Sequence, residues 1–140
     1  MARKLLRNFG LNLLKLFLVG DLLYLSINGV NYFAKKTTPI RTQIELESML
    51  KTERERLDIA GAIVINAKIE NSRTGTSYSG LIPGSQDYEI VIDSNQAYLG
   101  ILRHELYHVK NHVRRNFNGL RFFLIEEPEA ALYGAFRIKI

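Results

Sequence analysis

The stretch Tyr98–Val113, YLGILRHELYHVKNHV, is the part of this sequence that decides its fold. It contains no proline and a single glycine, Gly100, so little in it interrupts a helix. Apolar side chains recur at helical spacing along one stripe, at Leu102, Leu106, Val109 and Val113. A second stripe carries Ile101, His104, His108 and Asn111. The pattern predicts an amphipathic helix with one buried side, both histidines on another, and an N-cap within Asp93–Asn95.

Within this helix, His104, Glu105 and His108 belong to an H-E-x-x-H pentad. Residues i and i+4 lie on one helical face, roughly 6 Å apart along the axis, so both imidazoles can reach one metal ion. The carboxylate next to the first histidine can then act as general base on zinc-bound water. The pentad therefore predicts a Zn²⁺ site with two histidine ligands and a catalytic glutamate. The alternative is a surface helix whose histidines are incidental.

A catalytic zinc usually takes a third protein ligand. His112 lies one turn after the pentad, but three ligands along one straight helix cannot converge on a tetrahedral centre, so we expect a structural or surface role for it. The metzincin pattern is excluded, because Asn111 and Arg114 stand where it requires Gly and His. After His112 the sequence contains no His, Cys or Asp, and its only acidic residues are Glu126, Glu127 and Glu129. A ligand that follows the pentad is one of these three.

A second helical pattern begins near Glu126, and Pro128 suits its first turn. The pentad followed by Glu127-Pro128-Glu129-Ala130 resembles the gluzincins, zinc metallopeptidases with H-E-x-x-H and a later E-x-E-A-type helix, and the small size resembles the minimal gluzincins. The resemblance covers about residues 88–136. It implies a zincin-like fold, Zn²⁺ as cofactor, Glu127 as third ligand and a protein or peptide substrate.

The resemblance has one departure, at Ala131. Family members usually carry Asp or Asn there, which orients the first histidine. Ala131 therefore implies either another orienting residue for His104 or a weaker site, since loss of such support typically costs 10–100-fold. No residue is assigned to the oxyanion; Tyr107 and Tyr133 are candidates only by their proximity in the sequence.

The residues before the pentad predict the rest of an α+β domain. Thr42 and Glu45 form a capping box that opens a helix through Leu57. Three strands are predicted, at Ala60–Ile69, Arg73–Leu81 and Asp87–Asp93. We expect the last of them to be an edge strand that aligns an extended peptide by main-chain hydrogen bonds. The expected architecture is a small β-sheet packed against the active-site helix and a backing helix, with a long N-terminal helix.

Composition and charge bound the function. The 140 residues are 46% hydrophobic, enough for one core. The absence of cysteine excludes disulfides and cysteinyl zinc sites. Residues 1–41 hold seven basic residues and one acidic residue, a net charge of +6, whereas residues 42–140 hold twelve basic and thirteen acidic, a net charge of −1. The near-neutral charge of residues 42–140 leads us to expect no nucleic-acid partner. The gluzincin resemblance implies that these residues form a zincin-like metallopeptidase domain.

Residues 1–41 form an apolar and basic arm. Its apolar run, residues 11–33, contains Lys15 and Asp21, each of which costs roughly 2.5–3.5 kcal/mol at a bilayer centre. A long helix packed on the rest of the fold is the first expectation, contact with a membrane surface the second, and a span or signal peptide the third. The compartment is undetermined by the sequence; an intracellular location is expected, with membrane association as the alternative.

Two other functions stay open at this point. Ala131 and the short tail ending at Ile140 favour a catalytically degenerate zincin that acts as a binding or structural module. Alternatively, the arm is the functional part of a membrane-associated factor, and the metal site only stabilises the fold.

Overall fold

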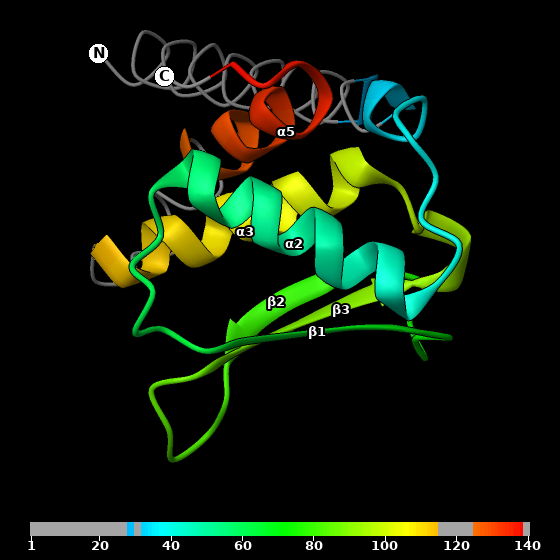
Figure 1. Ribbon diagram of the computed structural model, residues 1–140. Coiled ribbons are helices and arrows are strands. Elements are labelled where there is room, and N and C mark those ends of the chain that lie inside the picture. The colour runs from blue at the N-terminus through cyan, green and yellow to red at the C-terminus, as the bar shows by residue number, and fades with distance from the viewer. Residues whose placement is uncertain (1–27, 30–31, 115–124, 139–140) are drawn as a thin grey trace, which may run out of the picture.

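The computed structural model describes residues 28–29, 32–114 and 125–138, which form a small α+β domain, as predicted. In chain order its elements are helix α2 (Gln43–Leu57), strands β1 (Ile65–Glu70), β2 (Tyr78–Leu81) and β3 (Tyr88–Asp93), the 3₁₀ helix η1 (Ser94–Gln96), and helices α3 (Leu99–Arg114) and α5 (Glu127–Phe136). Helices α2 and α3 cover one face of the sheet, and α5 packs on the far side of α3 (Figure 1).

Most of the predicted amino-terminal helix lies outside these residues, because 1–27 and 30–31 are not described. Within the described part of the chain, no helix combines the length and apolarity needed to cross a membrane. Residues 32–40 lie against the start of α3: Ala34 is buried, and Ile40 N–H donates to the Ala97 carbonyl at 2.7 Å. This end of the arm therefore packs on the domain.

The sheet has the order β1-β3-β2, with β1 parallel and β2 antiparallel to β3. The predicted edge position of Asp87–Asp93 is therefore wrong: β3 is the central strand. Its burial explains the error, because Val91 and Asp93 are as buried as Ile90 and Ile92, so both faces of the strand are covered. A short connection after Leu81 returns the chain antiparallel beside β2, which leaves β2 as the outer strand.

Two predicted strands are shorter than expected, because turns take up their first residues. Residues 60–63 form a turn closed by Ile63 N–H to the Ala60 carbonyl at 3.1 Å, and β1 begins only at Ile65. Residues 72–75 form a second turn, in which Gly75 has a positive φ of 68°. The β2 strand then begins at Tyr78.

Helix α2 has the bounds that the sequence predicts. Its N-cap is Thr42, whose hydroxyl accepts from Glu45 N–H at 3.2 Å. The return bond of the capping box goes one residue further back, from Arg41 N–H to Glu45 Oε2 at 2.7 Å. Asp58 ends the helix in the left-handed conformation, at φ 56°.

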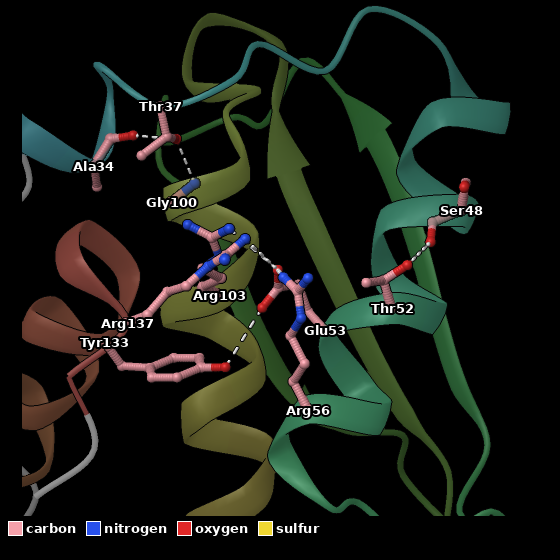
Figure 2. Close-up of polar contacts among 10 residues, drawn as sticks. All are labelled: Ala34, Thr37, Ser48, Thr52, Glu53, Arg56, Gly100, Arg103, Tyr133 and Arg137. Atoms are coloured by element: carbon pink, nitrogen blue, oxygen red, sulfur yellow. Dashed lines mark hydrogen bonds and ion pairs between the residues drawn. The ribbon is translucent and has the colours of Figure 1, made fainter.

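The N-cap predicted for α3 is wrong. Asp93 caps η1 instead, where its Oδ1 accepts from Asn95 N–H at 2.9 Å. The first turn of α3 is held by the preceding arm: Gly100 N–H donates to Thr37 Oγ1 at 2.6 Å (Figure 2), and Leu99 N–H donates to the Thr38 carbonyl at 2.8 Å. Sequence patterns miss such a cap, because the capping residue is 63 positions away from Gly100.

The predicted apolar stripe of α3 is buried over most of its length. Leu102, Leu106 and Val109 are at most 1% exposed, whereas Val113, the last member, is 42% exposed. These side chains join residues of α2, β1, β3 and α5 in one hydrophobic core. The core fixes the rotation of α3, and with it the direction of the face that carries the histidines.

A buried ion cluster around Glu53 connects helices α2, α3 and α5. The Glu53 carboxylate of α2, 1% exposed, binds Arg103 of α3 at 3.1 Å, Arg56 at 2.7 Å and Arg137 at 3.3 Å. The hydroxyl of Tyr133 on α5 points to the same carboxylate, at 3.4 Å (Figure 2). Burial alone would raise the pKa of Glu53, but the hydrogen bond and charge of Arg103, with the other arginines, hold that pKa below its usual value.

Candidate metal centre

His104 and His108 face each other one turn apart on α3. Both are largely buried, with side chains 10% and 11% exposed. Their Nε2 atoms lie 3.0 Å apart, and their rings are inclined at 73°. A helix provides this arrangement without further help, because i and i+4 side chains lie over one another. Each histidine therefore offers one nitrogen to the same point in space.

Glu127, the first residue of α5, completes this group. Its Oε2 lies 3.5 Å from His104 Nε2, and its Oε1 lies 3.3 Å from His108 Nε2. All three ligand atoms lie within 4.8 Å of one another. Ligands of a tetrahedral zinc at about 2.1 Å from the ion are about 3.4 Å from each other. The two histidine nitrogens lie 3.0 Å apart, and each lies 3.3–3.5 Å from one of the two Glu127 oxygens, close to that spacing, so the residues fit a zinc ion.

The position of α5 depends on a close helix contact. A Cβ atom added at Gly134 would lie 2.6 Å from the Gly100 carbonyl oxygen and 3.2 Å from His104 Cβ. On the next layer, a Cβ at Gly100 would lie 2.5 Å from the Ala34 carbonyl oxygen. Only glycine allows the two helices to approach this closely. The contact sets how near Glu127, at the other end of α5, comes to the histidines.

The electrostatics of the group favour a cation. Burial alone would lower the pKa of His104, but hydrogen bonding to Glu127 and the charges of Glu105 and Glu127 raise it. Burial alone would raise the pKa of Glu127, but hydrogen bonds to His104 and His108, and their charge, lower it to about 2. The site therefore holds a carboxylate that stays ionised over the whole physiological range.

Glu105 lies beside the metal-binding group and is 7% exposed. Its Oε2 accepts a hydrogen bond from Ser79 Oγ on β2, at 2.8 Å. A buried carboxylate needs such a partner, and this one fixes the carboxylate between α3 and the outer strand. Sequence analysis missed Ser79, because it lies 26 residues from Glu105 and no local pattern connects them.

These residues line a cavity of about 340 Å³. Its lining residues are Ile101, His104, Glu105, His108 and Glu127 of α3 and α5, together with residues 76–79 and Gln96. Asp93 holds the loop that precedes residues 76–79: its Oδ2 accepts from Ser72 N–H at 2.9 Å. The hydrogen bond from Asn95 N–H lowers the pKa of Asp93, and the hydrogen bonds from Ser72 lower it further. Burial acts in the opposite direction but is outweighed. The cavity therefore joins the metal-binding residues to the outer strand.

Other residues singled out in the sequence lie elsewhere. His112 is exposed, and its Nδ1 is 2.8 Å from the hydroxyl of Tyr88, consistent with a structural role. Glu129 accepts from the Tyr107 hydroxyl at 3.4 Å rather than joining the histidines. Neither Tyr107 nor Tyr133 lines the cavity. Their rings pack on each other, with the ring centroids 5.4 Å apart. Neither is therefore placed to stabilise an oxyanion in it.

Ala131 is buried, and its methyl side chain can accept no hydrogen bond. His104 Nδ1 is buried and has no hydrogen-bond partner among the described residues. Metal-binding histidines almost always donate this second nitrogen to a carboxylate, carbonyl or water. Neither Ala131 nor a replacement in the described part of the chain orients His104 in that way.

The comparisons with known proteins return nothing for this chain. No protein-family model matches it, no curated protein matches its sequence, and no solved structure matches its fold. The function must therefore be inferred from the site.

Proposed function

We propose that this protein is a zinc-dependent peptide hydrolase of the gluzincin type. The observation that carries the proposal is the triangle of His104, His108 and Glu127, with Glu105 next to it in a cavity. Two imidazoles and one carboxylate are the ligand set of thermolysin-type zinc sites. Zinc, when bound, lowers the pKa of water and polarises a carbonyl group.

The chain's own residues supply the proton transfers. Glu105 accepts a proton from the attacking water and later delivers it to the leaving amine. The hydrogen bond from Ser79 occupies one lone pair of Oε2 and holds the carboxylate in place, so its other oxygen is available to the water. Burial of Glu105 strengthens this role, because few waters compete for the carboxylate.

The outer strand β2 offers a place for an extended peptide. Ile82 N–H donates to the Asp87 carbonyl at 2.8 Å, and hydrogen-bonded pairs alternate along an antiparallel ladder. The main-chain groups of Ser79 and Leu81 therefore point away from β3, toward the edge where the described residues add no further strand. A peptide that adds to this edge lies along the cavity, as in other cases of strand addition. In the proposal, β2 replaces β3 as the substrate-aligning strand.

The proposal is tested by zinc analysis and peptide hydrolysis on two matched variants. His104→Ala should abolish both stoichiometric zinc and hydrolysis, because two remaining protein ligands rarely hold a catalytic ion. His112→Ala, on the same helix but outside the group, should keep about one zinc per chain and full activity. Full zinc retention by His104→Ala would rule out this metal centre.

The unsupported Nδ1 atom of His104 favours a second candidate, a degenerate zincin that binds metal as a structural or binding module. Under this alternative, wild-type protein binds zinc and gains stability from it, but it cleaves no member of a broad peptide library. Hydrolysis that disappears with His104→Ala excludes it.

A further inference from the structure

Gln96 presents a side-chain amide of fixed orientation to the cavity. Its Oε1 accepts two hydrogen bonds from Ser77, from the main-chain N–H at 3.0 Å and from Oγ at 3.1 Å. A main-chain N–H can only donate, so the amide oxygen must be the atom that faces Ser77. The Ser77 hydroxyl is fixed as well, because its Oγ already accepts from Asp93 N–H at 3.0 Å.

The amide nitrogen of Gln96 is consequently the atom left for the cavity. Nε2 carries two donors, and neither has a partner among the described residues. Gln96 lines the same cavity as the metal-binding residues. Ser77, which also lines the cavity, donates both its main-chain N–H and its hydroxyl to Gln96. Gln96 is thus a side-chain donor in the cavity that His104 and Glu105 also line.

Gln96 also lies at the N-terminal end of the outer edge of β2, where it binds Ser77. By the alternation of the ladder, the Ser77 N–H points to the same side as the main-chain groups of Ser79 and Leu81. A peptide added to this edge would find the Ser77 donor already taken by Gln96. In its place it would meet the two N–H groups of the amide, which lie further out from the strand.

We propose that Gln96 Nε2 donates a hydrogen bond to a main-chain carbonyl oxygen of the bound peptide, at the end of the strand pairing on β2. The inference rests on the proposed function and adds a specificity-determining residue to it. The ligand is an extended peptide long enough to pass Ser79 and place a carbonyl oxygen against the amide.

The test uses Gln96→Glu, which keeps an oxygen for Ser77 but replaces both N–H donors with a second acceptor. The control is Gln86→Glu, the same change at an exposed position outside the cavity. The probe is the peptide that wild type cleaves best from a random library, with binding measured on zinc-loaded proteins that also carry Glu105→Gln. We expect Gln96→Glu to raise the Kd of this peptide by about tenfold or more, and to raise KM equally in proteins that keep Glu105, with zinc content unchanged. The variant loses a hydrogen bond and also places a second acceptor against the peptide carbonyl. Gln86→Glu should change neither.

A second measurement removes the acceptor from the peptide instead. In a series of probe peptides, one main-chain carbonyl at a time is replaced by methylene, and each is bound to wild type and to Gln96→Met. One position should lose affinity on wild type but not on Gln96→Met, since the pair is then already broken. Equal losses on both proteins at every position, or an unchanged Kd for Gln96→Glu, would overturn the role of Gln96 alone. A wild-type protein that binds zinc but neither binds nor cleaves any peptide overturns the proposed function and this inference together.

Discussion

Glu127 and Glu129 are two residues apart at the start of α5, and their side chains reach different partners. Glu127 meets both histidines, at 3.3 and 3.5 Å, whereas Glu129 accepts from Tyr107. Residues two positions apart on a helix differ by about 200° around its axis, so the two carboxylates point to different sides. The register of α5 therefore decides which glutamate a metal ion would meet.

The first prediction separates the three glutamates. Glu127→Ala should lose stoichiometric zinc, because it removes the only carboxylate that lies with the histidines in the described part of the chain. Glu126→Ala and Glu129→Ala serve as controls and should keep about one zinc per chain. Metal analysis after dialysis measures all three. If Glu129→Ala is the variant that loses zinc, the register given to α5 and the gluzincin resemblance are both wrong.

At the residue scale, local spacing predicted part of the site. His104, Glu105 and His108 are found from the helical period alone, and the structure brings both imidazoles to one point. Glu127 needed the resemblance, since three glutamates fitted the composition. Ser79 and Gln96 gave no signal, because their contacts join segments 19 to 26 residues apart. Such pairings depend on the tertiary fold, which a single sequence does not encode as a local pattern.

At the scale of elements, the contact between α3 and α5 brings the three candidate metal ligands together. Gly134 packs against Gly100 and His104 of α3, so any side chain at 134 must push the helices apart. Helix packing transmits such a shift along the whole element, because helices move as rigid bodies. The distance from Glu127 to the histidines is therefore sensitive to a residue two turns away.

The second prediction follows from this contact. Gly134→Ala should destabilise the protein by about 1–3 kcal/mol through overpacking and should weaken zinc binding as α5 moves. Gly61→Ala is the matched control, because a Cβ there meets no atom within 4 Å. Urea unfolding and zinc titration report the two effects. Zinc affinity equal to wild type in Gly134→Ala would show that Glu127 does not depend on this contact.

The order of the elements was less predictable than their type. Periodicity identified α3 and β3 from their apolar positions, whereas the capping box of Thr42 and Glu45 identified α2 and Pro128 indicated the start of α5. It did not give the strand order, since the alternation in Tyr88–Asp93 suggested one exposed face, whereas the fold covers both faces of the strand. The N-terminal cap of α3 was not predicted for a related reason. Thr37 is close to Gly100 in the fold but far from it in the sequence.

At the scale of the whole molecule, the cluster around Glu53 joins α2, α3 and the end of α5. Arg103 in this cluster directly precedes His104, so the ion cluster and the candidate metal ligands are about 100° apart around the same turn of α3. Removing one partner of a buried ion pair leaves the others without compensation. The stability of the domain and the geometry of the site are therefore coupled through α3.

The third prediction concerns acid stability. The folded-state pKa of Glu53 lies below the ordinary value of 4.5, so its ionised form stabilises the fold above pH 4.5. That contribution is lost as the pH falls from 4.5 through the lowered pKa. Glu53→Gln should cost about 3 kcal/mol at neutral pH and should make the free energy of unfolding less dependent on pH below 4.5. Urea unfolding between acid and neutral pH measures both. Parallel pH profiles for wild type and variant would contradict the assigned role.

The proposed hydrolysis of peptides through Glu105 at this candidate zinc site is tested most directly by one comparison. Zinc content and peptide hydrolysis are measured on the same samples of wild type and Glu105→Gln, with cleavage of a peptide library followed by mass spectrometry. The proposed chemistry predicts equal zinc in both proteins and a loss of at least about 100-fold in the hydrolysis rate, because the amide cannot accept the water's proton. Equal hydrolysis by Glu105→Gln and wild type would contradict it.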